Sequence, residues 1–274
     1  MTINCNGKLI SLDHPKIMGI LNITPDSFYD GGKYKDESSI LNQVEKMLND
    51  GATFIDVGAY STRPGALEVN EAIELKRILP IVSLILQRFP KTILSIDTFR
   101  SKVAKECIGN GAAIINDISA GLQDEKMLPT VAKLNVPYIM MHMRGTPQNM
   151  QQHTDYDDIL KEVLSFFSER LVAAKSLGIK DIIVDPGFGF AKNLEQNYEL
   201  LKQMEIMNFV EHPILAGISR KSMIYKTLKT TADQALNGTT ALHMVCLQKG
   251  ANILRVHDVK EALECVKLYE QLNA

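Results

Sequence analysis

The stretch ILSIDTFRSKVAKECIGNGAAIINDI, residues 93–118, contains the repeating unit on which the fold depends. Short apolar runs stand at its two ends, at 93–97 and 114–118, and the longer segment between them ends at Asn110-Gly111. A run that is apolar on both faces is typical of a parallel strand covered by helices, and glycine after the last periodic residue is typical of a helix C-terminus. The stretch therefore predicts a strand–helix–strand unit.

The same alternation continues along the whole chain. Apolar runs that predict strands lie at 17–23, 54–58, 93–97, 114–118, 138–142, 182–186, 214–219 and 252–256. The intervening segments, for example 39–50 and 233–250, have helical periodicity. Eight such units favour a (β/α)8 TIM barrel over a doubly wound sheet, which usually has fewer strands and a glycine-rich first turn.

Further features predict how the barrel is organised within a single domain, 1–274. Residues 1–14, with the segment Ile3 to Leu12 around Asn6-Gly7, are expected to form a β-hairpin that plugs the bottom of the barrel. No linker or low-complexity tract divides the chain. Two long polar connections, 24–38 and 59–70, follow the first two strands and are expected to be mobile active-site loops.

Composition excludes several classes of protein. The 274 residues are 45% hydrophobic and 23% charged, which is typical of a globular domain, and the net charge of −2 indicates neither nucleic acid nor a membrane as a partner. The four cysteines have no CxxC spacing, which favours reduced thiols over a zinc site or disulfides. With no apolar leader and no run long enough to cross a bilayer, the protein is expected to be cytoplasmic.

Polar residues stand at the end of nearly every apolar run. They are Asn22, Asp56, Asp97, Asn116, Asp117, His142, Asp185, Ser219 to Lys221, Arg255 and His257. In a barrel these positions converge on the top face, where active sites lie. Every strand must leave into a polar loop, and this requirement explains roughly half of these residues. It does not explain Asp and Asn at so many successive strand ends, since an isolated buried carboxylate is costly.

Such a ring of polar groups could hold a metal ion or a flat ligand. Mg²⁺ needs neighbouring oxygens, whereas these acids come from strands spaced around the barrel. A carboxylate can instead accept from two adjacent N–H donors, as in a 2-aminopyrimidinone, and an asparagine can pair with a mixed edge. Lysine or arginine could stack on such a ring, and the groups at Ser61–Gly65 and 255–257 are of the kind that bind phosphate.

The segment DPGFGFAK, 185–192, admits three interpretations: a phosphate cradle, a structural corner, or a site for a flat ring. It lacks the Gly-Lys-Ser/Thr order of a nucleotide phosphate loop, so the first is disfavoured. Its lysine, Lys192, is expected to lie in solvent. The histidines His14, His153, His212 and His243 are expected to be ordinary surface or helix residues.

Eight motifs in order identify the chain as similar to a known family. They are GILNITPDSFYDGG (19–32), STRPG (61–65), SIDT (95–98), NDIS (116–119), MHMRGTP (141–147), DPGFGFAK (185–192), SRK (219–221) and RVHDV (255–259). With them the chain resembles the dihydropteroate synthases over essentially its whole length. It departs from the family at Gly58-Ala59, where the family often has Gly-Gly before STRPG.

The resemblance implies a TIM-barrel transferase that acts on small molecules. It would condense 6-hydroxymethyl-7,8-dihydropterin diphosphate with p-aminobenzoate, giving dihydropteroate and diphosphate with Mg²⁺. A dissociative displacement suits this chemistry, because diphosphate is a good leaving group and the electron-rich ring can carry a cation. The aromatic amine is neutral at pH 7, so no general base is demanded. The resemblance also implies a homodimer, for which the last two helices are the expected surface.

The family's site residues map onto this sequence motif by motif. Asp97, Asn116 and Asp185 would hydrogen-bond the pterin, with Lys221 at its carbonyl side, Arg255 stacked on the ring, and Ile118, Met140 and Gly217 packed around it. Asn22 would reach the Mg²⁺–diphosphate, and Arg63, Arg255 and His257 would bind phosphate oxygens. Phe190 and Ser222 would line the p-aminobenzoate pocket, closed by Phe28, Thr62 and Pro64 from the two loops. Asn22, Arg63, Lys221, Arg255 and His257 are thus the expected catalytic residues.

Other functions share parts of this pattern. A pterin-binding methyltransferase domain, which passes a methyl group to a corrinoid, has a related barrel, but the STRPG block and the paired loops favour the synthase. A non-catalytic pterin-binding paralogue would not need Asn22, Arg63, Lys221, Arg255 and His257 together. A barrel enzyme of unrelated chemistry is disfavoured by the ordered motifs, which fold alone would not supply.

Overall fold

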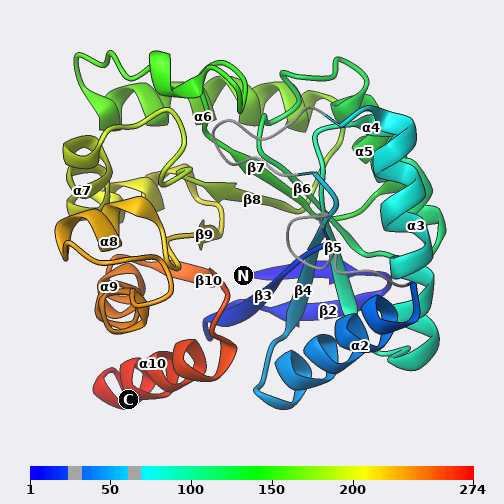
Figure 1. Ribbon diagram of the computed structural model, residues 1–274. Coiled ribbons are helices and arrows are strands. Elements are labelled where there is room, and N and C mark those ends of the chain that lie inside the picture. Colours follow the sequence, from blue (N-terminus) through cyan, green and yellow to red (C-terminus); the bar gives the residue numbers. More distant parts are fainter. Residues whose placement is uncertain (24–32, 61–68) are drawn as a thin grey trace.

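Eight parallel strands close into a barrel in the computed structural model (Figure 1), which describes residues 1–23, 33–60 and 69–274, and of 33–36 only the backbone. The strands are β3 (Lys16–Asn22), β4 (Phe54–Gly58), β5 (Ile93–Asp97), β6 (Ile114–Asp117), β7 (Tyr138–Met141), β8 (Ile182–Asp185), β9 (Ile214–Ala216) and β10 (Ala251–Val256). Each pairs with the next along the chain, and β10 pairs with β3. The predicted TIM barrel is confirmed.

Helices surround the barrel and cover the outward faces of its strands (Figure 1). They are α2 (Lys33–Asn49), α3 (Glu71–Arg88), α4 (Ser101–Gly109), α5 (Met127–Leu134), α6 (Ile159–Ser176), α7 (Leu194–Lys202), α8 (Ser222–Thr227), α9 (Leu236–Gln248) and α10 (Val259–Leu272), with short 3-10 helices η1 (Met150–Gln152) and η2 (Met204–Val210). Outward strand residues such as Ile55, Val57 and Leu94 pack with helix residues such as Val82 and Val103 in one core cluster. This burial on both strand faces explains the nearly continuous apolar runs.

The hairpin predicted at the N-terminus is formed by β1 (Thr2–Cys5) and β2 (Lys8–Ser11), paired antiparallel across Asn6-Gly7. Asn6 has φ +52° and Gly7 φ +83°, the left-handed conformations that a tight hairpin turn requires. Ile3, Cys5, Ile10 and Leu12 pack with inward residues near the start of the barrel strands, Met18 among them. The hairpin therefore fills the bottom of the barrel, as predicted.

The predicted loop 24–38 is partly wrong, because α2 begins at Lys33. Residues 33–38 are helical, but the aliphatic residues that give the helix its periodicity begin at Ile40, so no hydrophobic periodicity marks the segment before them. Residues 24–32 lie outside the described part of the chain. In the second predicted loop, 59–70, Asn70 caps α3 by accepting from the Ile73 backbone N–H at 2.9 Å, and 61–68 lie outside the description.

Candidate active site

Strand register places three predicted residues, Asn22, Asp97 and Asn116, in one row with Gly58 at the top of the barrel. Asn22 is opposite Gly58, Gly58 is opposite Asp97, and Asp97 is opposite Asn116. Gly58 leaves space in this row, since a Cβ built on it would lie 3.5 Å from both Asn22 Oδ1 and Asp97 Oδ2. The row thus brings an amide, a carboxylate and a second amide together around a position with no side chain.

Arg255 on β10 joins the Asp97 carboxylate of this row to Asp56, which lies two residues before Gly58 on β4. Its Nε donates to Asp56 Oδ2 at 2.6 Å, and its Nη2 donates to Asp97 Oδ2 at 2.7 Å. Asn116 Nδ2 donates to the same Asp56 oxygen at 3.0 Å. Asp56 is fully buried, and within the described residues its Oδ1 has no hydrogen-bond partner. A buried carboxylate oxygen without a donor is costly, so a ligand N–H at Oδ1 would be favourable.

Burial and charge oppose each other in this group. Burial raises the pKa of Asp97 to about 7, and the positive charge of Arg255 limits the increase. Burial likewise disfavours the charge of Arg255, but Asp56 and Asp97 more than compensate and raise its pKa above the ordinary value. Arg255 therefore stays cationic, and its two carboxylate partners are held at the mouth of the barrel.

Asp185 and Lys221 form the opposite side of the site. Asp185 is 6% exposed, and its Oδ1 accepts from the Gly187 backbone N–H at 2.8 Å. Its Oδ2 lies 3.8 Å from the position of a Cβ on Gly217, so the absence of a side chain there keeps this oxygen accessible from the barrel axis. Burial raises the pKa of Asp185, while the nearby charge of Lys221 lowers it.

Lys221 precedes α8 and turns its ammonium group toward the loop after β8. Its Nζ donates to the Phe188 carbonyl and lies 4.5 Å from the centre of the Phe190 ring. Burial lowers the pKa of Lys221 to about 8, and the carboxylate of Asp185 opposes that shift. Ser222 follows as the first residue of α8 and is therefore adjacent in the chain to Lys221, whose Nζ lies over the Phe190 ring.

Phe190 borders a small apolar cluster at the top of the barrel. The cluster contains Ile118, Met141 and Met143, with Phe190 and Phe99 packed against it. Met140 is fully buried but belongs to the layer between barrel and helices, because neighbouring residues of a strand point to opposite faces. Met141, not selected from the sequence, shares the cluster of Ile118 and Phe190.

His257 lies just after β10, beside the end of β9. Its backbone N–H donates to Ser219 Oγ at 3.2 Å, and its Nδ1 is 3.1 Å from the same hydroxyl. Arg220 holds the adjoining Asp258 through two bonds of 2.8 Å, from Nε to Oδ2 and from Nη2 to Oδ1. These bonds join the loop after β9 to the loop after β10. They therefore fix the segment that carries Lys221 relative to the segment that carries Arg255 and His257.

Not every strand-end carboxylate faces the site. Asp117 is fully buried and accepts from Ser119 N, Ser119 Oγ, Gly121 N and the Tyr138 hydroxyl at 2.6–2.8 Å. Its neighbour Asn116 points inward, so Asp117 points outward and braces the turn after β6. Asp117 is therefore explained by its structural role in the turn where the strand ends, and no ligand is needed to account for it.

The expectation that Lys192 lies in solvent is wrong. Lys192 is 3% exposed, and its Nζ lies 2.9 Å from His142 Nδ1 and 3.0 Å from each of the Gly187 and Phe190 carbonyl oxygens. His243 is on a helix, as expected, but it is buried at 1% exposure, and burial lowers its pKa to about 4. The burial of both residues was not apparent in the sequence, because a single polar residue carries no periodic signal of burial.

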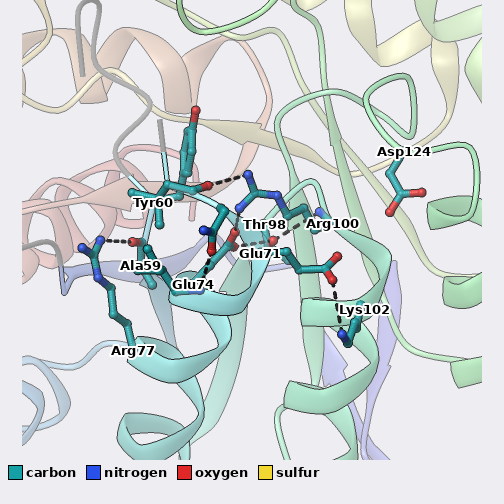
Figure 2. A network of polar contacts seen from close by, with 12 residues as sticks. Ala59, Tyr60, Glu71, Glu74, Arg77, Thr98, Arg100, Lys102 and Asp124 are labelled. Carbon is teal, nitrogen blue, oxygen red and sulfur yellow. Dashed lines mark hydrogen bonds and ion pairs between the residues drawn. The ribbon is translucent and has the colours of Figure 1, made fainter. Parts of the chain in front are cut away.

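A second polar network lies beside the flanks of residues 61–68 (Figure 2). Glu74 on α3 is fully buried, accepts from Thr98 Oγ1 at 2.7 Å and pairs with Arg100. Arg100 also donates to the Val69 carbonyl at 2.6 Å and lies 5.4 Å from the centre of the Tyr60 ring. Glu74 could have been found from its spacing, since it stands four positions before Ile78 and eight before Val82 on the buried helix face.

Several predicted residues lie outside the described part of the chain: Phe28, Thr62, Arg63 and Pro64. Across residues 1–23, 33–60 and 69–274, no three His, Cys, Asp or Glu side chains are grouped so as to hold a metal ion. In the same residues no helix is long and apolar enough to span a membrane. Asn22, half-buried at the end of β3, has its amide oxygen beside the space at Gly58.

Comparisons with known proteins agree with this geometry. A family model described as pterin binding enzyme matches residues 18–257. The dihydropteroate synthase of Escherichia coli (strain K12) is 42% identical over 272 residues, which cover 98% of this chain and 96% of that protein.

Solved structures give the same result. The Yersinia pestis dihydropteroate synthase in a sulfonamide drug complex matches with a TM-score of 0.93 and 41% identity, over 100% of this chain and 99% of that one. The Xanthomonas albilineans dihydropteroate synthase with 4-aminobenzoic acid matches with a TM-score of 0.92 and 36% identity, over 100% of this chain and 98% of that one.

Proposed function

The chain belongs to the pterin-binding enzymes and, among them, to the dihydropteroate synthase family of transferases, and on this premise we propose its substrates and mechanism. We propose that it joins 6-hydroxymethyl-7,8-dihydropterin diphosphate to the amino group of p-aminobenzoate, with release of diphosphate. The observation that carries the proposal is the set of inward polar groups at the top of the barrel, Asp56, Asp97, Asn116 and Asp185, with Arg255 and Lys221 beside them.

These groups match the edge of a pterin. Asp185 has one oxygen held by Gly187 and a second beside Gly217, and this second oxygen can accept from the ring's N–H groups. Asn116 can pair with an edge that has both a donor and an acceptor. Lys221 supplies a donor for the ring carbonyl. Arg255, held at two points by carboxylates, presents a planar guanidinium that can stack on the ring.

The second substrate would lie against Phe190 and Ser222. Phe190 is half-buried beside Lys221, so one face of a flat aromatic acid can pack on its ring while the cation remains near the carboxylate. The bound 4-aminobenzoic acid of the Xanthomonas albilineans relative supports this class of substrate. We propose that Phe28, Thr62, Arg63 and Pro64 complete this pocket when both substrates are bound.

Catalysis in this proposal relies on positioning and charge. The bond between the exocyclic methylene and the diphosphate oxygen breaks first, and the ring carries the resulting cation beside Asp97 and Asp185. The neutral amine of p-aminobenzoate then attacks the methylene, and the proton lost from the new ammonium group passes to the departing diphosphate. Arg63, Arg255 and His257 would stabilise the departing diphosphate, and exclusion of water would protect the cation.

Magnesium would reach this site with the diphosphate. The residues present suit an ion that arrives bound to the substrate. Mg²⁺ is commonly bound by one or two protein oxygens together with phosphate oxygens and water. The Asn22 amide oxygen is the protein ligand that the described residues offer, and no acidic cluster stands among them to hold the ion alone. When bound, the ion supplies neutralisation of the diphosphate charge.

We also propose a cytoplasmic homodimer. Leu268 and Leu272 on α10 are 62% and 72% exposed, which favours a contact through the last two helices, α9 and α10. Light scattering at several protein concentrations tests the oligomeric state, and a monomer at every concentration would reject it.

The deciding assay combines pure protein, the pterin diphosphate, p-aminobenzoate and Mg²⁺, with dihydropteroate detected by chromatography. We expect product that depends on both substrates. Folded protein that binds the pterin but makes no product would instead favour the non-catalytic paralogue. Methyl transfer from a methylated pterin to a corrinoid, without dihydropteroate formation, would favour the methyltransferase.

A further inference from the structure

We propose that Lys192 is a positioning residue for the p-aminobenzoate half of the reaction, because its buried amino group holds the turn that carries Phe190. The inference rests on the proposed function. It assigns a role to a side chain that does not itself line the substrate site and that sequence reasoning placed in solvent.

The amino group of Lys192 lies inside the turn after β8. Its Nζ is 3.0 Å from both the Gly187 and Phe190 carbonyl oxygens, the first and last residues of the turn. The Phe190 N–H also donates to the Gly187 carbonyl at 3.1 Å, which closes the turn. One side chain therefore binds both ends of a four-residue turn from its inner side.

His142 fixes the amino group from the neighbouring strand. Its Nδ1 is 2.9 Å from Lys192 Nζ, and its backbone carbonyl is 3.4 Å away. Burial lowers the pKa of His142 well below the ordinary value, so the neutral ring can accept through Nδ1. The ring is itself held edge-on against Phe166, with the centroids 4.9 Å apart. Lys192 is thus attached to a rigid part of the barrel.

The path of this turn requires glycine at two positions. Gly187 has φ +69°, and a Cβ there would lie 2.1 Å from the His142 carbonyl oxygen. Gly189 has φ +81°, and its N–H donates to Asn197 Oδ1 at 2.6 Å. Glycine permits this path but does not select it. The hydrogen bonds from Lys192 select it, since they hold the two carbonyls inward.

Both substrate half-sites meet at this turn, but they depend on Lys192 differently. Asp185 is held by its bond to the Gly187 N–H and by its place in β8, and Lys192 takes part in neither contact. Of the hydrogen bonds described, the Phe190 carbonyl has only the one from Lys192. Loss of Lys192 should therefore displace Phe190 and its contact with Lys221 more than it displaces Asp185.

The test compares steady-state kinetics of the wild type with Lys192→Met and Lys192→Gln. Methionine fills similar volume without a donor, and glutamine returns an N–H donor. We expect the KM for p-aminobenzoate to rise about tenfold or more in Lys192→Met, because small displacements of a substrate-positioning group have effects of this size or larger. Lys192→Gln should be intermediate. The Kd for the pterin diphosphate should change less than about threefold, because Asp185 keeps its bonds.

A matched control separates positioning from simple loss of stability. Val266→Ala removes buried volume from α10, away from the turn, and should lower the melting temperature without changing either substrate constant. If Lys192→Met and Lys192→Gln alter only the active fraction, as this control does, the inference is overturned. If Lys192→Met does not fold, Lys192→Gln decides alone. A wild type that makes no dihydropteroate rejects the proposed function, whereas an active wild type with unchanged KM in the variants rejects only the role of Lys192.

Discussion

Replacing Asp185 with asparagine should abolish most of the pterin affinity while leaving the fold intact. The carboxylate is 6% exposed, with Oδ1 bonded to the Gly187 N–H and Oδ2 beside the open space at Gly217. In Asp185→Asn the amide oxygen can keep the Gly187 bond. The amide NH₂ then takes the place of Oδ2 and meets the N–H groups of the ring with a donor of its own.

The size of the loss follows from these two changes. A hydrogen bond to a charged acceptor contributes about 1.5–3 kcal/mol, and a buried group left unsatisfied costs about 1–3 kcal/mol. A total of about 3 kcal/mol corresponds to a dissociation constant roughly 100-fold higher. Isothermal titration calorimetry with the pterin diphosphate, without p-aminobenzoate, measures this difference directly.

Asp117→Asn is the matched control. Asp117 is also a buried carboxylate at a strand end, but its four hydrogen bonds go to Ser119, Gly121 and Tyr138 of the protein. Its loss should lower the free energy of unfolding by about 2–3 kcal/mol and change the pterin Kd less than about threefold. Unchanged affinity in Asp185→Asn, or an equal loss of affinity in Asp117→Asn, would refute the assignment of Asp185 to the pterin edge.

Other predictions follow from charge and packing. Burial lowers the pKa of Lys221 to about 8, so its ammonium form is present below that pH and lost above it. The KM for the pterin diphosphate should therefore rise from pH ~7 to ~9 in the wild type and not in Lys221→Met. Arg100→Leu should lower the free energy of unfolding by about 3 kcal/mol, because it leaves the buried Glu74 without its cation, and Arg100→Leu/Glu74→Leu should recover at least about 1 kcal/mol in urea unfolding. If the double variant is no more stable than the single one, the pair is not coupled. Leu12→Ala, beside the N-terminal hairpin at the bottom of the barrel, should lower the free energy of unfolding by about 2–4 kcal/mol. The KM values for both substrates should stay unchanged, and altered KM values would contradict the separation of the hairpin from the site.

The architecture could be predicted because its signals repeat. Each strand is buried on both faces, so runs such as 54–58 and 93–97 are apolar at nearly every position. Eight such runs indicate a closed barrel. Neighbouring strands in the barrel follow one another in the chain, so the strand-end residues are expected at one end of the barrel, and in the structure Asp97 lies opposite Asn116. The polar first turns of α2 have no such repeat, so the predicted loop, 24–38, wrongly includes the helical residues 33–38.

Single buried polar residues were the part that sequence could not reveal. Lys192 and His142 are far apart in the chain and meet only because β7 and the loop after β8 are adjacent. Asp117 and Asn116 are equivalent in the sequence, and only the alternation of strand faces separates a structural carboxylate from a site amide. Lys192 was misassigned because lysine is usually exposed, and its burial depends on partners that no local pattern shows.

The pairing of β10 with β3 has a consequence for synthesis on the ribosome. Arg255 meets Asp56 across 199 positions of sequence, so the carboxylates of the early strands emerge long before the cation that balances them. Until residues 251–256 are available, β3 has an unpaired edge and the early half-barrel contains uncompensated acids. A nascent chain at that stage should be a client for chaperones and should not be stabilised by pterin. Binding competence would then appear only in the last step of folding, when the final strand closes the ring.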